Sequence, residues 1–291
     1  MITERVRYRA TLAYDGAAYE GFQRQIDGTP TIQGAVEAAL AAVTGQQATV
    51  LGAGRTDTGV HATGQVIAFD VAWQHSDEAL QRALNANLPD DIALQAVESL
   101  GAGATFHPRF DAVTRLYRYR VYQAAHRHPL WRSCAWYVRR TLDGAALDTA
   151  AALLTGRHDF AAFGKPPNER STNTVRTVSH SAWAHDPAAE GVLWTYVIEA
   201  DAFLQHMVRR IVGTLVDVGR GALTVDQFAA LLHDAAPLSA KAMAPPHGLT
   251  LAQVSYGAAP PPINTESAEE NGRGNNRDGT HKNLRTKTTG N

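Results

Sequence analysis

The residues best suited to chemistry lie in one glycine-rich stretch, which spans residues 52–65. It reads Gly-Ala-Gly-Arg-Thr-Asp-Thr-Gly-Val-His-Ala-Thr-Gly-Gln and places Asp57 in its middle, two residues after Arg55. Glycines permit tight turns and close approach of a ligand, and a carboxylate on a loop between strands is a common catalytic arrangement. The stretch therefore predicts a loop that presents Asp57 to a ligand. Composition alone favours the simpler alternative, an aspartate that only forms a turn.

A second segment, residues 115–122, alternates arginine with aromatic side chains. On a strand, Arg115 and Tyr117 share one face, whereas Arg118 lies on the other. Arginines beside aromatic rings suit phosphate contact and base stacking, as in RNA-binding sheets. An amphipathic strand with core tyrosines and solvated arginines explains the segment equally well.

Positive charge is concentrated around that segment. The chain as a whole has a formal net charge of -1, but residues 101–140 hold eight arginines, no lysine and one acid, Asp111. Such asymmetry indicates an anionic partner, and a merely solvated face is an equally good explanation of the charge alone. The arginines of this basic stretch are Arg109, Arg115, Arg118, Arg120, Arg127, Arg132, Arg139 and Arg140.

A third segment, residues 203–213, has the apolar spacing of a helix. Leu204, Met207 and Ile211 belong to its buried stripe. Arg209 and Arg210 lie close to this stripe, and a partly buried arginine requires a carboxylate partner, for which Asp57 is the obvious candidate. The alternative is that both arginines extend to water.

Several function classes lack their signatures in this chain. The twelve histidines form no His-Glu-x-x-His motif, so we expect no catalytic metal, and the lack of a phosphate-binding P-loop and of a Gly-x-Ser-x-Gly motif argues against a P-loop NTPase and a serine hydrolase. Cys134 is the one cysteine, which excludes an intrachain disulfide and fits a reducing compartment. The N-terminus has no apolar signal core and no stretch is credible as a membrane span, so we expect a cytoplasmic protein.

The elements that must position these residues follow from periodicity and from start and stop signals. Residues 1–105 predict the order βαββαβ, and residues 106–257 repeat it. The expected strands are 5–14, 48–53, 65–71, 92–97, 115–123, 174–184, 192–200 and 249–256, and the expected helices are 31–45, 76–88, 143–154, 203–218 and 225–232. This is an α+β fold with two ferredoxin-like subdomains in tandem. Residues 258–291 are too polar to bury a core and predict a disordered tail.

The motifs together resemble one family. Residues 54–62, Gly-Arg-Thr-Asp-Thr-Gly-Val-His-Ala, are similar to the catalytic loop of the TruA family of tRNA pseudouridine synthases. Further matches follow in the family's order from about residue 5 to 256: Tyr14-Asp15-Gly16, 21–25, 106–110, Tyr117-x-Tyr119, 156–160, 174–177, 203–213 and 248–251. The tail after Gly257 lies outside the resemblance.

The resemblance implies roles for individual residues. Asp57 corresponds to the catalytic aspartate, Arg209 to the arginine that pairs with it, Arg55 to the loop arginine near the flipped nucleotide, and Tyr117 to the tyrosine that stacks on the target uracil. Arg115, Arg118 and Leu249 are the further residues that we expect at the substrate. It also implies two ferredoxin-like subdomains that share a central antiparallel sheet, with helices packed on one side.

The activity implied is conversion of uridine to pseudouridine at positions 38, 39 and 40 of the tRNA anticodon stem-loop. Members of the family need no cofactor or metal and act on tRNA as homodimers. Two alternatives stay open at this point: a non-catalytic RNA-binding module with two RNA-recognition-type units, and a synthase of the same chemistry that acts on another structured RNA.

Overall fold

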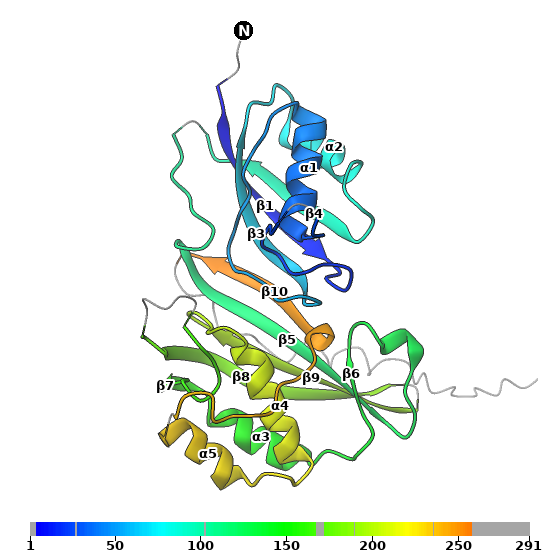
Figure 1. Ribbon diagram of the computed structural model, residues 1–291, viewed down its shortest axis with the longest axis vertical. Helices are drawn as coiled ribbons and strands as arrows, with labels where there is room; N and C mark the ends of the chain where they lie inside the picture. The colour runs from blue at the N-terminus through cyan, green and yellow to red at the C-terminus, as the bar shows by residue number, and fades with distance from the viewer. Residues whose placement is uncertain are drawn as a thin grey trace, which may run out of the picture. The chain divides into compact units, whose positions relative to one another are not determined.

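One mostly antiparallel sheet runs through the whole of the described chain (Figure 1). The computed structural model describes residues 4–26, 28–101, 103–166, 172–188, 190–234 and 236–257. Along the sheet the strand order is β4-β1-β3-β10-β5-β9-β8-β7, with β2 paired to β3 and β6 paired to β5. The strands are β1 Val6–Tyr14, β2 Leu51–Gly52, β3 His61–Val71, β4 Ile92–Ser99, β5 Ala112–Ala124, β6 Trp136–Val138, β7 Gly156–Asp159, β8 Val175–Ala188, β9 Gly191–Ala200 and β10 Leu249–Tyr256.

Five α-helices accompany the sheet in the described part of the chain. They are α1 Ile32–Thr44, α2 Asp77–Asn85, α3 Gly144–Ala152, α4 Met207–Gly219 and α5 Val225–Asp234. Four of them begin at a side chain that accepts a hydrogen bond from the first turn: Thr31, Ser76, Asp143 and Thr224. Such caps satisfy backbone N–H groups that have no partner within the helix, so these starts are fixed by local sequence.

Strand β10 joins the two halves of the sheet. It pairs in parallel with β3, where Thr250 lies opposite His61, and antiparallel with β5. The beginning of β10 therefore lies beside the beginning of β3. Residues 53–60, the glycine-rich loop, come immediately before β3 and carry Asp57. This pairing brings residues near 250 next to residues near 60, a proximity that their separation in the sequence does not suggest.

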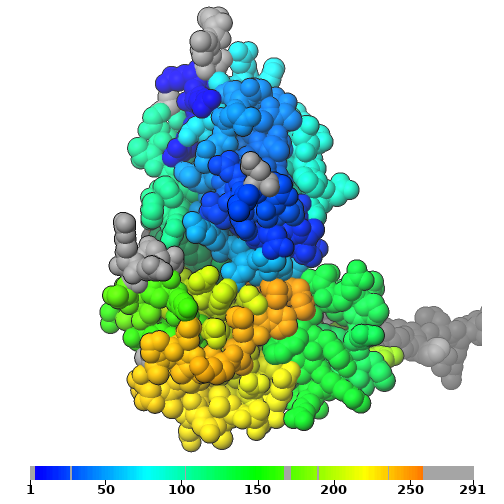
Figure 2. Space-filling model, in the orientation of Figure 1, coloured from blue at the N-terminus to red at the C-terminus, as the bar shows by residue number. Residues whose placement is uncertain are grey.

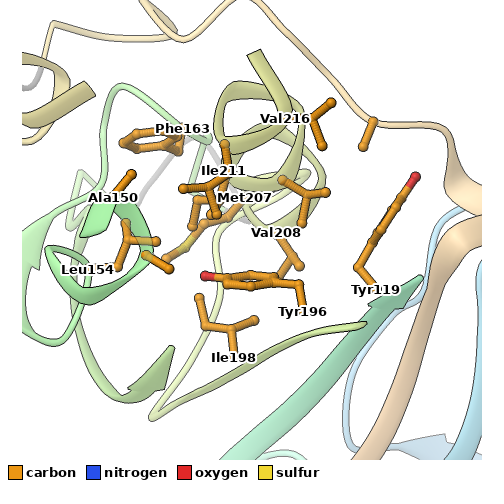
Figure 3. Packing of buried hydrophobic residues seen from close by; sticks show 14 of the residues in the cluster. Tyr119, Ala150, Leu154, Phe163, Tyr196, Ile198, Met207, Val208, Ile211 and Val216 are labelled. Atoms are coloured by element: carbon orange, nitrogen blue, oxygen red, sulfur yellow. The ribbon is translucent and has the colours of Figure 1, made fainter. Parts of the chain in front are cut away.

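The apolar residues form a core on each side of this junction. In the C-terminal half, Tyr196 and Ile198 of the sheet pack with Met207, Val208 and Ile211 of α4 (Figure 3). In the N-terminal half, β1 and β3 pack against α1 and α2 through the buried residues Tyr8, Leu12, Ile67, Val36, Leu40, Leu80 and Leu84. Tyr117 is partly buried and packs against both cores, so it lies where the two halves of the sheet meet.

The structure confirms the α+β class and most of the expected elements, and it corrects several bounds. The strand expected at 65–71 begins earlier, at His61, whereas the strand expected at 48–53 shrinks to Leu51–Gly52. The strand expected at 174–184 extends further, through Asp186 and Pro187 to Ala188, and pairs with β9 up to Gly191. Strands β6 and β7 are too short to give a periodic signal, and the sequence does not predict them.

The correction with most consequence concerns helix α4. The apolar spacing predicts a helix from Phe203, but the helix begins at Met207. His206 has φ 63, a left-handed backbone that cannot continue a right-handed helix, and the Gln205 N–H donates to the Lys165 carbonyl at 2.9 Å. Residues 203–206 therefore do not form the first turn of the helix. Gln205 forms a β-bridge with Lys165, and His206 turns the chain into α4.

In the described part of the chain, no helix has the length and apolar character that a membrane crossing requires. The expected disordered tail, residues 258–291, lies outside the described residues.

Candidate active site

The glycine-rich loop is held against an earlier segment of the chain, residues 14–22. The Phe22 N–H donates to the Thr56 carbonyl at 3.1 Å, and the Tyr14 hydroxyl and the Thr56 hydroxyl are 2.8 Å apart. A Cβ atom on Gly16 would lie 2.0 Å from the Val60 carbonyl oxygen, so only glycine fits there. The loop is therefore a rigid platform, fixed before any ligand arrives.

Asp57 meets an arginine that lies 152 residues further along the chain. One Arg209 guanidinium nitrogen, Nη1, donates to the Asp57 Oδ2 atom at 3.2 Å, while Arg209 Nε donates to the Ala244 carbonyl at 2.9 Å. The Arg209 side chain is 13% exposed and that of Asp57 is 31% exposed. The guanidinium is thus anchored at one end and orients the carboxylate with the other, leaving Asp57 accessible to a ligand.

The neighbouring arginine has a different role. Arg210 Nη1 donates to the Ala240 carbonyl at 2.8 Å and takes no part in the contact with Asp57. The helical spacing alone placed both arginines near the apolar stripe without distinguishing them, whereas the family resemblance singled out Arg209. The helix position decides between them, because only Arg209 lies on the side of α4 that faces the glycine-rich loop.

His206 is a residue of this cluster that sequence analysis missed. Its Nε2 atom lies 3.5 Å from Asp57 Oδ2, and its side chain is 34% exposed. The left-handed backbone at His206 turns the chain just before α4 begins. The available signal was its spacing of three residues before Arg209, which places both side chains near one another at the start of a helix.

Tyr117 lies deeper than the charged groups. Its ring makes an edge-to-face contact with Phe203, with centroids 5.0 Å apart. Burial raises the pKa of the Tyr117 hydroxyl well above its usual value, and the nearby Tyr14 and Asp57 add to the effect. The phenol therefore stays protonated and neutral at physiological pH, an apolar ring with one polar atom.

These residues line one open cavity of about 1160 Å³. Its walls come from the glycine-rich loop, from β5, from residues 202–209 and from the turn before β10. Figure 2 shows the orange segment that precedes β10 between the blue residues of the N-terminal half and the yellow residues of α4. Space for a nucleotide, a fixed carboxylate, an arginine and a partly buried aromatic ring are found together here, which suits base chemistry on a nucleic acid.

Comparison with known proteins decides the family. The model described as "tRNA pseudouridine synthase" matches residues 10–111 and 150–257. The chain belongs to the tRNA pseudouridine synthase family. A curated tRNA pseudouridine synthase A of Chloroflexus aurantiacus is 46% identical over 84% of this chain and 87% of its own length. Another, of Neisseria meningitidis serogroup B, is 40% identical over 87% of this chain and 93% of its own length.

Likeness to solved structures is much weaker. A chain of the structure titled "Crystal Structure of a Cbf5-Nop10-Gar1 Complex" matches 72% of this chain and 54% of its own length, at 11% identity and a TM-score of 0.28. The sequence relatives carry the assignment. They make this member of the family a pseudouridine-forming isomerase rather than a non-catalytic RNA-binding module.

Arg55 and Leu249, two residues that we expect at the substrate, lie at the same cavity as Asp57. Both line the cavity, Arg55 as an exposed side chain and Leu249 as a buried one at the beginning of β10. Arg55 Nε donates to the Gln23 side-chain oxygen at 3.0 Å, a contact at the surface that a ligand can displace. These two residues, with Asp57, Arg209 and Tyr117, form the set that the structure brings together.

Arg115 also lines the cavity, but its guanidinium is already occupied. It donates to the carbonyls of Ala53 at 3.4 Å, Arg109 at 2.6 Å and Asp201 at 2.9 Å, and to that of Ala112. These carbonyls belong to the segments that surround the cavity. Arg115 therefore ties the walls of the site to each other, and the structure shows no free donor fork toward a phosphate.

Arg118 is not part of this cluster. It is exposed on the face of β5 opposite Tyr117 and does not line the cavity. The alternation of the strand, which the sequence showed, places it there. Of the eight arginines of the basic stretch, only Arg109 and Arg115 line the cavity, so this stretch does not form one continuous surface around Asp57.

No group of three or more metal-ligating side chains is found among the residues that the structure describes. Among the described residues, the ion pairs of Asp57 are those with Arg209 and His206.

Proposed function

We propose that this synthase converts uridines 38, 39 and 40 of the tRNA anticodon stem-loop to pseudouridine, with Asp57 as the essential residue. One observation carries the proposal: a fixed, accessible carboxylate, held by Arg209, shares a nucleotide-sized cavity with the partly buried ring of Tyr117. Similarity to curated tRNA pseudouridine synthases supports tRNA as the substrate.

The reaction rearranges bonds without oxidation or reduction. The bond between uracil N1 and ribose C1′ breaks, the uracil turns, a bond forms between C5 and C1′, and the proton on C5 is lost while N1 gains one. Asp57 acts in its ionised form, either as a nucleophile on the nucleotide or as the base that removes the ribose 2′ proton. Arg209 fixes the rotamer of Asp57 through a charge-assisted hydrogen bond and thereby reduces the cost of aligning it.

The target uridine must leave the helical stem to reach Asp57. Flipping costs a few kcal/mol of unstacking, of which stacking on Tyr117 recovers about 1–3 kcal/mol. Arg55, exposed at the cavity on the rigid loop, fills the space that the uridine vacates. Leu249, at the beginning of β10, packs against the ribose or base from the opposite wall.

We also propose that the sheet is built from two ferredoxin-like subdomains, residues 1–105 and 106–257, with the helices on one side. The strand orders β4-β1-β3-β2 and β10-β5-β9-β8 support this, because each is the order expected of a βαββαβ unit. Tyr117, which contacts the cores of both halves, supports a common helical side.

We further propose a homodimer that works in the cytoplasm. The resemblance to the TruA family supports the dimer, and tRNA as substrate together with a single free cysteine, Cys134, supports a reducing cytoplasm. Sedimentation velocity measures the oligomeric state directly, and a monomer that retains full activity would contradict the dimer.

The experiment that tests the proposed positions uses three tRNA transcripts. Each has uridine at one of the positions 38, 39 and 40 and another base at the other two. Treated transcripts are labelled with a carbodiimide that marks pseudouridine, and the sites are located by primer extension. We expect a stop at each of the three positions and none in a transcript that lacks all three. Modification elsewhere in tRNA, or only in another structured RNA, would contradict the positions while leaving the chemistry intact.

A further inference from the structure

An exposed aromatic ring lies at the rim of the cavity. Phe110 is 74% exposed, and it lines the cavity together with its neighbours His107 and Arg109. Single exposed apolar residues are common, but among the exposed large apolar side chains of the described chain only Phe110 lies at the cavity, and this position sets it apart.

The turn that carries Phe110 is firmly built. His107 Nδ1 accepts hydrogen bonds from the backbone N–H groups of Arg109 at 3.2 Å and Phe110 at 3.4 Å, and the His107 N–H donates to an Asp111 carboxylate oxygen at 2.9 Å. Arg115 Nη2 donates a hydrogen bond to the Arg109 carbonyl at 2.6 Å. The exposure of Phe110 is therefore a property of an ordered turn that the molecule has fixed in advance.

The groups around the ring suit a nucleobase and its phosphate. The His107 ring lies 4.3 Å from the Phe110 ring, centroid to centroid, and the Arg109 guanidinium carbon lies 5.8 Å from that ring centroid. Arg109 is exposed and forms no ion pair with any residue that the structure describes. An exposed aromatic ring beside a guanidinium that has no ion pair is an arrangement with which proteins bind unstacked bases of RNA.

We propose that Phe110, with His107 and Arg109, forms a second base-binding site, which stacks a nucleotide that flanks the flipped uridine. Flipping one nucleotide leaves its neighbour without a stacking partner on that side, and Phe110 replaces this partner at the rim while Tyr117 receives the target inside. The inference rests on the proposed function, because it takes the occupant of the cavity to be a nucleotide of tRNA.

The test compares Phe110→Ala, Phe110→Leu and Phe110→Tyr in the full-length protein, with Leu130→Ala as the matched control. Leu130 is 82% exposed and does not line the cavity. For unmodified tRNA we expect Kd and KM to rise about 5- to 100-fold for Ala and by nearly as much for Leu, as expected for loss of one stacked base. For Phe110→Tyr and for the Leu130→Ala control we expect Kd and KM within about 2-fold of the wild-type values. In all these variants kcat changes little, because the stack forms before the transition state.

Rescue by the aromatic variant is the decisive comparison. If Phe110→Leu binds tRNA as well as the wild type, the contact of Phe110 is only apolar and the stacking site is refuted. If Phe110→Ala shifts the sedimentation coefficient toward that of a smaller species, the ring belongs to an interface between protein copies, and the proposal is overturned as well. Release of C5 tritium by the wild type tests the proposed function separately, since Kd of the variants does not depend on turnover.

Discussion

At the scale of the residue, Asp57 is useful because its position is fixed from two sides. The glycine-rich loop holds its backbone, and Arg209 holds its carboxylate. Arg209 is itself held by the Ala244 carbonyl, so the pair depends on a segment just before β10. Catalysis by a carboxylate requires this kind of alignment, because a displacement of about 1 Å can cost about 100-fold in rate.

Replacing Arg209 by lysine tests this alignment. An ammonium group cannot contact Asp57 Oδ2 and the Ala244 carbonyl in the fork geometry of the guanidinium, so Asp57 loses its fixed rotamer. We expect kcat for tritium release to fall about 100-fold and the Kd for tRNA to change less than about 3-fold. Wild-type turnover by Arg209→Lys would show that the charge alone suffices.

A second prediction at the scale of the residue concerns Arg115 and its hydrogen bonds to the backbone. Its replacement by methionine leaves several carbonyls at the walls of the site without their donor, at a cost of about 1–3 kcal/mol for each that stays buried. We expect urea denaturation to show a loss of at least about 2 kcal/mol in the free energy of unfolding, together with a lower kcat. Arg118→Met, on the exposed face of the same strand, is the control and leaves both quantities nearly unchanged. An equally stable and active Arg115→Met would contradict the role assigned to this side chain.

At the scale of the element, the site exists because two distant strands begin side by side. β3 follows the glycine-rich loop, β10 follows the segment that holds Arg209, and the two pair in parallel at His61 and Thr250. Segment 14–22 closes the loop from the other side. Chemistry here depends on the junction of elements, none of which carries the site alone.

Gly16 provides the test at this scale. In Gly16→Ala the added methyl group meets the Val60 carbonyl at 2.0 Å, so the loop or segment 14–22 must move. We expect the free energy of unfolding to fall by about 1–3 kcal/mol and turnover to fall with it. Gly54→Ala, with nothing within 4 Å of the added atom, is the control for stability. Equal stability of Gly16→Ala and the control would mean that the loop is not clamped.

Sequence periodicity predicted most of these elements but not their junction. The caps at Thr31, Ser76 and Asp143 are local, which is why the starts of α1, α2 and α3 were predictable. The start of α4 was not, because the left-handed residue His206 interrupts an apolar pattern that continues through it. For the same reason His206 was missed beside Asp57, whereas the pairing of Asp57 with Arg209 was anticipated from charge, burial and the family resemblance.

At the scale of the whole molecule, the interior contains several tyrosines whose hydroxyl groups stay protonated at physiological pH. Burial raises the pKa of Tyr14 to about 12 and that of Tyr117 and Tyr196 further. In each case the folded protein retains a proton that the unfolded chain releases near pH 10, so the stabilisation is complete below pH 10 and is lost as the pH rises through the folded value.

We therefore expect the free energy of unfolding, measured in urea, to fall between pH 10 and about 12 with little tyrosine contribution below this range. Tyr14→Phe removes one of the titrating groups, so its stability declines less steeply with pH than that of the wild type. Parallel pH profiles for the two proteins would contradict the assigned role of Tyr14.

The molecule as a whole must also attract a polyanion while its net charge is -1. Seven arginines of the basic stretch are exposed, so binding of tRNA should depend on local phosphate contacts and weaken with salt. We expect a slope of about 3 or steeper in a plot of log Kd against log salt concentration, equivalent to roughly four phosphate contacts. A flat dependence would contradict phosphate binding.

The central claim is that Asp57 performs the chemistry in a cavity that binds tRNA without it. The most direct measurement follows tritium release from tRNA labelled at uridine C5, under single-turnover conditions, for the wild type and Asp57→Asn, with tRNA affinity measured for both. The account predicts release by the wild type, none above background by Asp57→Asn, and nearly equal affinities. Release by Asp57→Asn at a rate near that of the wild type would contradict it.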